Sequence, residues 1–120
     1  MVEDDAAARD ALQHLFRHDG WEVTVAANLR DGLVALTRPV DWVVLDLLLP
    51  DGDGVQVLEF IRRKRMRCRV AVVTGVTDQK QLRHVAGLEP EVLLTKPVDF
   101  EQLLRIIERT DADADGGESI

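Results

Sequence analysis

The sequence has a single cysteine, no tyrosine and few other aromatic residues. One cysteine excludes an internal disulfide framework and is typical of a reducing compartment. We expect Cys68, at the start of a predicted strand, to be unreactive. No apolar run approaches the roughly 18 residues that a membrane-spanning helix needs, and the N-terminus has no basic region followed by an apolar one. These absences predict a soluble cytoplasmic protein that has no contact with a membrane.

Positive charge is also scarce. The chain has 15 Lys and Arg residues against 22 Asp and Glu, which gives a formal net charge of -7. No basic cluster rises above an ordinary solvated surface, so nucleic acid and anionic membrane are poor partners for the isolated chain. The 120 residues, 46% of them hydrophobic, supply one core and too little material for two.

The most informative segment is residues 46–54, which follow the apolar run 42–45. A strand that would be buried on both faces ends there on Asp46, and turn-forming residues come directly after it. The carboxylate is therefore expected at the mouth of a sheet, where reactive groups are found.

Helix-like and strand-like segments alternate along the chain. Helices are predicted at residues 6–17, 29–37, 53 or 54 to 64, 78–85 and 100–107, and strands at residues 21–25, 43–46, 70–74 and 92–94. The second helix must end before Pro39, because the residue before a proline disfavours helical geometry. Residues 111–120 are acidic and almost without large apolar side chains, so they are predicted to be a disordered tail after a domain of residues 1–110.

This alternation predicts an α/β fold with right-handed crossovers and a parallel sheet covered on both faces. Functional sites in such sheets gather at the carboxyl ends of the strands. Four features fall at those ends: the acidic residues 3–5, Asp46, Thr74 and Lys96. They can therefore meet in one pocket.

Carboxylates of Glu3, Asp4 and Asp46 in one pocket would repel one another unless a proton or a cation intervened. Oxygen ligands with room for water suit Mg²⁺ best. Lys96 adds a compact positive charge and Thr74 a hydroxyl group. A divalent ion, an ammonium and a hydroxyl together describe a phosphoryl-binding site in which Asp46 could be the nucleophile.

With these elements in this order, the chain resembles the receiver domains of two-component response regulators over residues 2–110. The elements that carry the resemblance are the acidic pair Glu3-Asp4, the phosphoacceptor and its turn at Asp46, Pro50 and Asp53-Gly54, the hydroxyl and small residue Thr74-Gly75, and the pair Lys96-Pro97.

The resemblance implies a flavodoxin-like, doubly wound sheet of five parallel strands in the order 2-1-3-4-5. It also implies that Asp46 accepts a phosphoryl group from a histidine kinase or a histidine phosphotransfer protein, after which Lys96 and Thr74 turn toward it. Mg²⁺ would be held by Asp4, Asp46 and the backbone carbonyl of Leu48, with Glu3 acting through water. The Lys96-Pro97 peptide would commonly be cis.

The same resemblance implies an output through the surface of the last two helices, which could also form a homodimer. Such a domain is a phosphoacceptor in a phosphorelay rather than an enzyme.

Three departures from the family pattern alter these expectations. Leu93 stands where the family usually has an aromatic switch residue, so a damped or different output is expected. Leu48 and Val76 are apolar and cannot orient an attacking water, so the phosphoryl group should be lost slowly. Only Met1 and Val2 precede the acidic residues, whereas a strand usually has about five residues.

The short first strand has three interpretations: the true start lies upstream, the chain is a shortened variant, or a neighbour fills the gap. Low stability or self-association is a fair hypothesis, because a short central strand leaves backbone groups of its neighbours exposed.

Several polar residues also have a purely structural interpretation. Asp51 and Asp53 more often cap a helix than bind a metal, and Asp5 is expected at a helix start. Trp42 is expected in the core or at its rim. The three histidines, His14, His18 and His84, are expected on the surface.

Two other classes stay open. A pseudo-receiver would keep the fold as an unphosphorylated protein-interaction module, which the short first strand and Leu93 favour. A small Mg²⁺-dependent phosphohydrolase would need a second acid two residues after Asp46, and Leu48 stands there instead.

Overall fold

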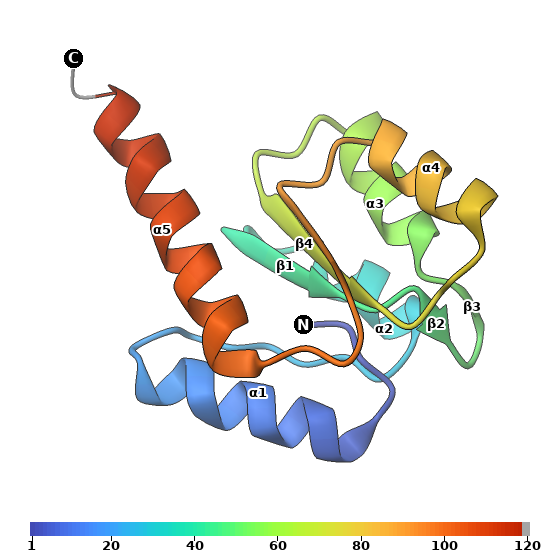
Figure 1. Cartoon of the computed structure of the whole chain (residues 1–120), viewed down its shortest axis with the longest axis horizontal. Helices are drawn as coiled ribbons and strands as arrows, with labels where there is room; N and C mark the ends of the chain where they lie inside the picture. The colour runs from blue at the N-terminus through green and yellow to red at the C-terminus, as the bar shows by residue number, and fades with distance from the viewer. Residues whose placement is uncertain (119–120) are drawn as a thin grey trace.

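The computed structural model describes residues 1–118 and contains a parallel sheet of three regular strands. They are β1 (Trp42–Leu45), β4 (Arg69–Thr74) and β5 (Val92–Thr95), in the order β1-β4-β5 (Figure 1). Val2 extends this sheet, because it forms parallel bridges with Leu45 on one side and Ala26 on the other. With Val2 counted as the first strand, Ala26 as the second and β1, β4 and β5 as the third to fifth, the spatial order is second, first, third, fourth, fifth. The doubly wound fold is confirmed.

The strand predicted at residues 21–25 is wrong as a regular strand. That segment is extended, but only Ala26 forms a bridge. A regular strand needs a ladder of backbone hydrogen bonds with a neighbouring strand. The neighbour of this segment is the first strand, of which only residues 1–3 take part in such bonds.

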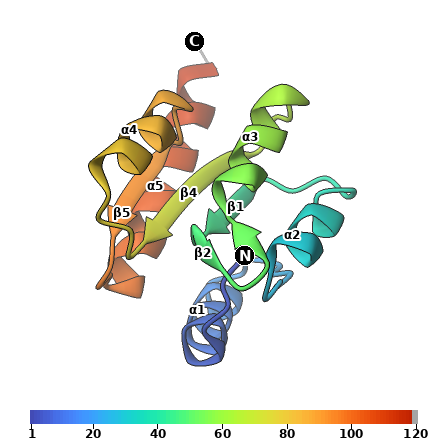
Figure 2. The same cartoon turned by 90° about the vertical axis from the view of Figure 1, so that its right-hand side faces the viewer.

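Helices cover both faces of the sheet (Figures 1 and 2). Helices α1 (Ala6–His18) and α5 (Phe100–Glu118) share one core with Val44, whereas α2 (Leu29–Ala35), α3 (Val55–Arg63) and α4 (Gln79–Gly87) share the other with Val43 and Leu45. The two cores separate because successive side chains of a strand point to opposite faces.

Short polar side chains cap the starts of α1, α2 and α4. Asp5 caps α1 by accepting hydrogen bonds from the backbone N–H groups of Ala7 and Ala8, which confirms its predicted place at a helix start. Asn28 caps α2 and Asp78 caps α4 in the same way. Helix α2 ends before Pro39, as predicted.

The turn after Asp46 contains a small hairpin that the sequence patterns did not predict. Its strands are β2 (Leu48–Leu49) and β3 (Gly52–Asp53), which pair in antiparallel fashion. The hairpin leads directly into α3 and fixes the path of the chain beside Asp46.

Helix α5 continues to Glu118, through most of the segment that was predicted to be a disordered tail. One reason is that Asp111 is anchored: its Oδ1 accepts hydrogen bonds from Arg69 Nη1 at 2.6 Å and from Trp42 Nε1 at 3.3 Å. The last two residues of that predicted tail lie outside the described residues. Within residues 1–118, no helix has both the length and the apolarity needed to cross a membrane.

Candidate functional site

Asp46 follows the last residue of β1, and its side chain is buried, with an exposed fraction of 3%. Its backbone N–H donates to the Val2 carbonyl at 2.9 Å, which ties it to the first strand. Its Oδ1 accepts a hydrogen bond from the backbone N–H of Leu48 at 3.1 Å. A buried carboxylate is costly unless its oxygens are satisfied, so these contacts hold the group in a set orientation.

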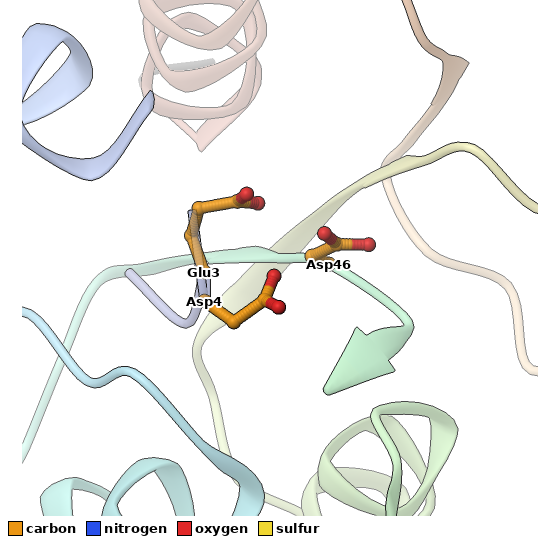
Figure 3. Close-up of side chains that lie close together, drawn as sticks. All are labelled: Glu3, Asp4 and Asp46. Carbon is orange, nitrogen blue, oxygen red and sulfur yellow. The ribbon is translucent and has the colours of Figure 1, made fainter. Parts of the chain in front are cut away.

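Glu3 and Asp4 bring two further carboxylates to the same place (Figure 3). Each of the three residues offers an oxygen atom within 4.8 Å of the others. Glu3 is buried and Asp4 is exposed, so the cluster has an inner wall and an open side. The predicted meeting of the acidic pair with Asp46 is therefore observed.

Lys96 neutralises part of this charge. Its Nζ donates to Asp46 Oδ2 at 3.0 Å and to Glu3 Oε1 at 3.2 Å. Its backbone N–H donates to the Thr74 carbonyl at 2.8 Å, and the Lys96-Pro97 peptide is cis, as the resemblance implied. The end of β5 thus positions the ammonium over both carboxylates.

Burial raises the pKa of Glu3, and the nearby negative charge of Asp46 raises it further, although Lys96 acts against both. Burial lowers the pKa of Lys96, but its hydrogen bonds to Asp46 and Glu3 and their charges outweigh burial, so that the net pKa is raised. Lys96 is therefore held as an ammonium, and the cluster keeps an excess of negative charge.

This donor set fits a hard divalent cation. Three carboxylates face one ammonium, all of the candidate ligand atoms are oxygens, and the exposed side at Asp4 leaves room for water. Mg²⁺ prefers oxygen ligands and keeps several waters, so the chemistry matches it. The Leu48 backbone carbonyl stays a predicted ligand.

Thr74 ends β4 and is fully buried. Its hydroxyl oxygen accepts a hydrogen bond from the backbone N–H of Val76 at 3.1 Å, so the side chain braces the loop that follows the strand. Leu93 lies on β5 and packs against the core shared with α2, α3 and α4.

Asp51 and Asp53 lie outside the acidic cluster and accept hydrogen bonds from helix starts, as predicted. Asp53 accepts from the backbone N–H of Val55, at the start of α3, at 3.0 Å. Asp51 reaches across to α2 and accepts from the N–H groups of Leu29 at 2.7 Å and Arg30 at 3.0 Å.

Two supporting residues, Arg9 and Gln81, were missed by sequence reasoning, and the close contact at Gly54 was not predicted. Arg9 Nη1 donates to the backbone carbonyls of Glu3 and Asp4, each at 3.0 Å, and so fixes the acidic loop. Gln81 contacts Asp53 from α4. A Cβ added at Gly54 would lie 2.2 Å from the Asp46 carbonyl oxygen, so only glycine allows this approach. The Gly- and Asp-rich composition around Gly54 indicated a tight turn in the sequence. Arg9 and Gln81, by contrast, look like ordinary surface residues of helices.

In this doubly wound α/β domain a buried aspartate, Asp46, directly follows β1, and an acidic pair and a lysine face it. This arrangement defines a receiver domain. The family model for the response regulator receiver domain matches residues 1–108, and the chain belongs to this family.

Curated relatives and solved structures agree with this assignment. The chain is 33% identical over 105 residues to the acid tolerance regulatory protein ActR of Rhizobium meliloti, covering 87% of this chain and 54% of that protein. It is 37% identical over 106 residues to the KDP operon transcriptional regulatory protein KdpE of Escherichia coli, covering 86% of this chain and 46% of that protein. The chain thus spans about half the length of these curated relatives.

A similar solved structure is the CheY-like response regulator receiver domain protein from Methanospirillum hungatei. It superposes with a TM-score of 0.89 at 25% sequence identity and covers 97% of this chain and 94% of that one.

Proposed function

We propose that this domain accepts a phosphoryl group on Asp46 from a phosphohistidine of a histidine kinase or a phosphotransfer protein. The observation that carries the proposal is the convergence of three carboxylates and the Lys96 ammonium at the carboxyl ends of the strands. Family membership supports a receiver role, and the residues named here give that role a chemical basis.

In this reaction a carboxylate oxygen of Asp46 forms a bond to phosphorus, and the bond from phosphorus to the histidine nitrogen breaks. The nitrogen keeps the bonding electron pair and leaves as imidazole. Lys96 is placed to stabilise negative charge on the transferring group, because its ammonium already contacts Asp46 Oδ2 at 3.0 Å. Asp4, Asp46 and the Leu48 backbone carbonyl would hold Mg²⁺, with Glu3 acting through water, and the ion would supply further positive charge for the phosphoryl oxygens.

Phosphorylation of Asp46 changes the contacts made by the loops that bear Lys96 and Thr74. A phosphoryl group adds about -1.5 to -2 charge and strong acceptor oxygens. The Lys96 ammonium therefore turns from Glu3 toward the new acceptor, and the Thr74 hydroxyl, whose oxygen accepts from the Val76 N–H, donates its proton to it. Because the two loops join β4, β5 and their helices, the surface of α4 and α5 is the proposed output and a possible homodimer interface.

We expect the phosphorylated form to be long-lived. The positions two residues after Asp46 and two after Thr74 carry Leu48 and Val76, and neither side chain can accept a hydrogen bond from an attacking water. A lifetime of only seconds, measured by phosphate release, would contradict this expectation.

The test is intact-mass spectrometry after incubation with acetyl phosphate, with and without Mg²⁺. We expect one phosphoryl adduct that requires Mg²⁺ and is absent from Asp46→Asn. Asp53→Asn is the matched control, since Asp53 lies in the adjoining turn but outside the acidic cluster, and it should still be modified. A folded protein that forms no adduct would overturn the proposal in favour of an unphosphorylated interaction module.

A further inference from the structure

A basic segment lies at the carboxyl end of α3 and in the loop that leads to β4. Residues 62–69 contain six of the chain's 15 Lys and Arg residues, and residues 60–77 contain no Asp or Glu. The segment precedes β4, whereas β4 ends at Thr74, whose carbonyl accepts a hydrogen bond from Lys96, the partner of Asp46 (Figure 1). It therefore lies at the opposite edge of the sheet from the acidic cluster.

Two of the six basic side chains are used inside the fold. Arg62 donates from Nε to the Leu88 carbonyl and from Nη2 to the Glu89 carbonyl, each at 2.8 Å, and so ties α3 to the end of α4. Arg69 is paired with Asp111 on α5. The positive charge of these two residues is already committed to structure.

The other four basic side chains are exposed, and none is in an ion pair among the side chains of residues 1–112. We call them the basic patch: Arg63, Lys64, Arg65 and Arg67. The dipole of α3 accounts for cations in its last turn, but this effect falls off within that turn. Arg67 follows the cap residue Lys64 by three positions, beyond the reach of the dipole.

An aromatic ring holds two of these cations together. Phe60 is half-buried and packs against the core shared by α2, α3 and α4. Arg63 Cζ lies 5.8 Å from the centre of its ring and Lys64 Nζ lies 6.0 Å from it, both within cation–π range. Side chains that are ordered before binding lose less conformational entropy when a partner arrives.

The turn after α3 exposes the remaining two. Arg65 has a φ of 52°, its N–H donates to the Arg62 carbonyl at 3.2 Å, and the Met66 N–H donates to the Ile61 carbonyl at 3.1 Å. Met66 packs inward against the core, whereas Arg65 and Arg67 on either side of it are exposed. A hydrogen-bonded turn therefore fixes the backbone that carries both guanidinium groups.

We propose that the basic patch docks a short acidic segment of a partner protein, whose Asp and Glu side chains pair with the four cations. A guanidinium group can bind a carboxylate through two parallel hydrogen bonds, which gives such a contact direction as well as charge. The patch is remote from Asp46, so this docking is separate from the proposed phosphoryl transfer.

The charge of the rest of the chain favours a short partner over a long polyanion. Outside residues 62–69 the chain has 22 acidic residues against nine Lys and Arg. Charges are screened beyond about 8 Å at physiological salt, so a short peptide on the patch feels mainly the four cations. A nucleic-acid duplex or an anionic membrane also brings its charge against the acidic remainder of the surface.

The test is fluorescence anisotropy of a labelled, end-blocked peptide of sequence Glu-Asp-Glu-Glu-Asp-Glu, titrated with the whole chain. We expect saturable binding that weakens as salt is added, and no saturable binding of the neutral peptide Gln-Asn-Gln-Gln-Asn-Gln. In NMR spectra of the ¹⁵N-labelled chain, the peptide should shift the amides of residues 63–67 and leave that of Asp46 unchanged.

Matched variants separate the patch from net charge. Arg63→Ala with Lys64→Ala should weaken peptide binding about tenfold. Arg30→Ala with Arg38→Ala removes the same charge from exposed positions elsewhere and should leave binding nearly unchanged.

Arg65→Gly separates binding from folding. Glycine suits the positive φ at this position, so this variant should bind the peptide several-fold more weakly and melt no lower than the parent chain. Phosphorylation of Asp46 by acetyl phosphate should be the same in every variant, so a failure here leaves the proposed phosphoacceptor role untouched.

Four outcomes would overturn the proposal. The acidic peptide could fail to bind the folded chain, or the control pair at Arg30 and Arg38 could weaken binding as much as the patch pair. A DNA duplex that binds as tightly as the peptide at the same salt would assign the patch to nucleic acid. Concentration-dependent shifts at residues 63–67 without peptide would assign it to a second copy of the chain.

Discussion

Gln81 on α4 donates a hydrogen bond from Nε2 to Oδ2 of Asp53 at 2.9 Å. The other carboxylate oxygen of Asp53 accepts from the Val55 N–H at the start of α3. Asp53 therefore joins the turn that follows the proposed phosphoacceptor to a helix of the proposed output surface. This contact offers a path between site and surface that does not use an aromatic switch residue, and Leu93 occupies that switch position here.

Replacing Gln81 by alanine should loosen α4 without affecting Asp46. We expect faster hydrogen exchange in α4 and little change in phosphorylation by acetyl phosphate, because the lost bond lies outside the acidic cluster. Gln79→Ala, at the exposed start of the same helix, is the matched control. Equal exchange rates in the two variants would show that the contact does not restrain the helix.

Removing the charge of Lys96 should destabilise the protein in the absence of Mg²⁺. Lys96→Met leaves the buried carboxylates of Glu3 and Asp46 to repel each other. Losing one partner of a buried pair costs roughly 3–5 kcal/mol. Because the Lys96 side chain is 35% exposed, solvent screening should reduce the loss to about 2 kcal/mol. Urea denaturation measures this loss in the free energy of unfolding.

Urea denaturation of a second variant separates the effect of charge repulsion on stability from the effect of lost packing. Adding Asp46→Asn to Lys96→Met should recover part of the lost free energy of unfolding, and Mg²⁺ should stabilise Lys96→Met by binding the native state. If the double variant is no more stable than Lys96→Met, repulsion is not the cause.

Gly54 is expected to be intolerant of any side chain. An alanine Cβ there would lie 2.2 Å from the Asp46 carbonyl oxygen and 2.8 Å from Leu47 Cα, so the backbone of the site must move. We expect Gly54→Ala to lower both the melting temperature and the rate of phosphorylation. At Gly87 a Cβ would meet nothing within 4 Å, so Gly87→Ala should leave both unchanged or raise stability slightly.

The Asp51 cap should make stability depend on pH in the acid range. Hydrogen bonds from the N–H groups of Arg30 and Leu29 hold the pKa of Asp51 below its usual value of 3.8. The folded state therefore favours the carboxylate, and its contribution is present above pH 3.8 and is lost as the pH falls through the lower folded-state pKa.

Asp51→Ala should accordingly melt a few degrees lower than the parent chain near neutral pH, and the two melting curves should converge in acid. Asp10→Ala, at an exposed position on α1, is the control. A difference that persists unchanged to the lowest pH at which the protein folds would rule out the carboxylate as the cause.

The amino-acid sequence by itself determined the fold class and the identity of the clustered residues, and its resemblance to receiver domains supplied the strand order. Apolar runs that end on polar residues mark the carboxyl ends of strands, and in a parallel sheet those ends share one edge. Glu3, Asp46 and Lys96 could therefore be placed together although 93 positions separate Glu3 from Lys96.

Tertiary structure alone decided which contacts those residues make. The segment at residues 21–25 has a strand-like composition but lacks a neighbour long enough to pair with, and α5 continues past Thr110 because Asp111 meets Arg69 and Trp42. Arg9 and Gln81 are common surface types, and only their positions in space give them partners. Local patterns record propensity and burial, whereas hydrogen-bond partners distant in sequence are set by how the elements pack.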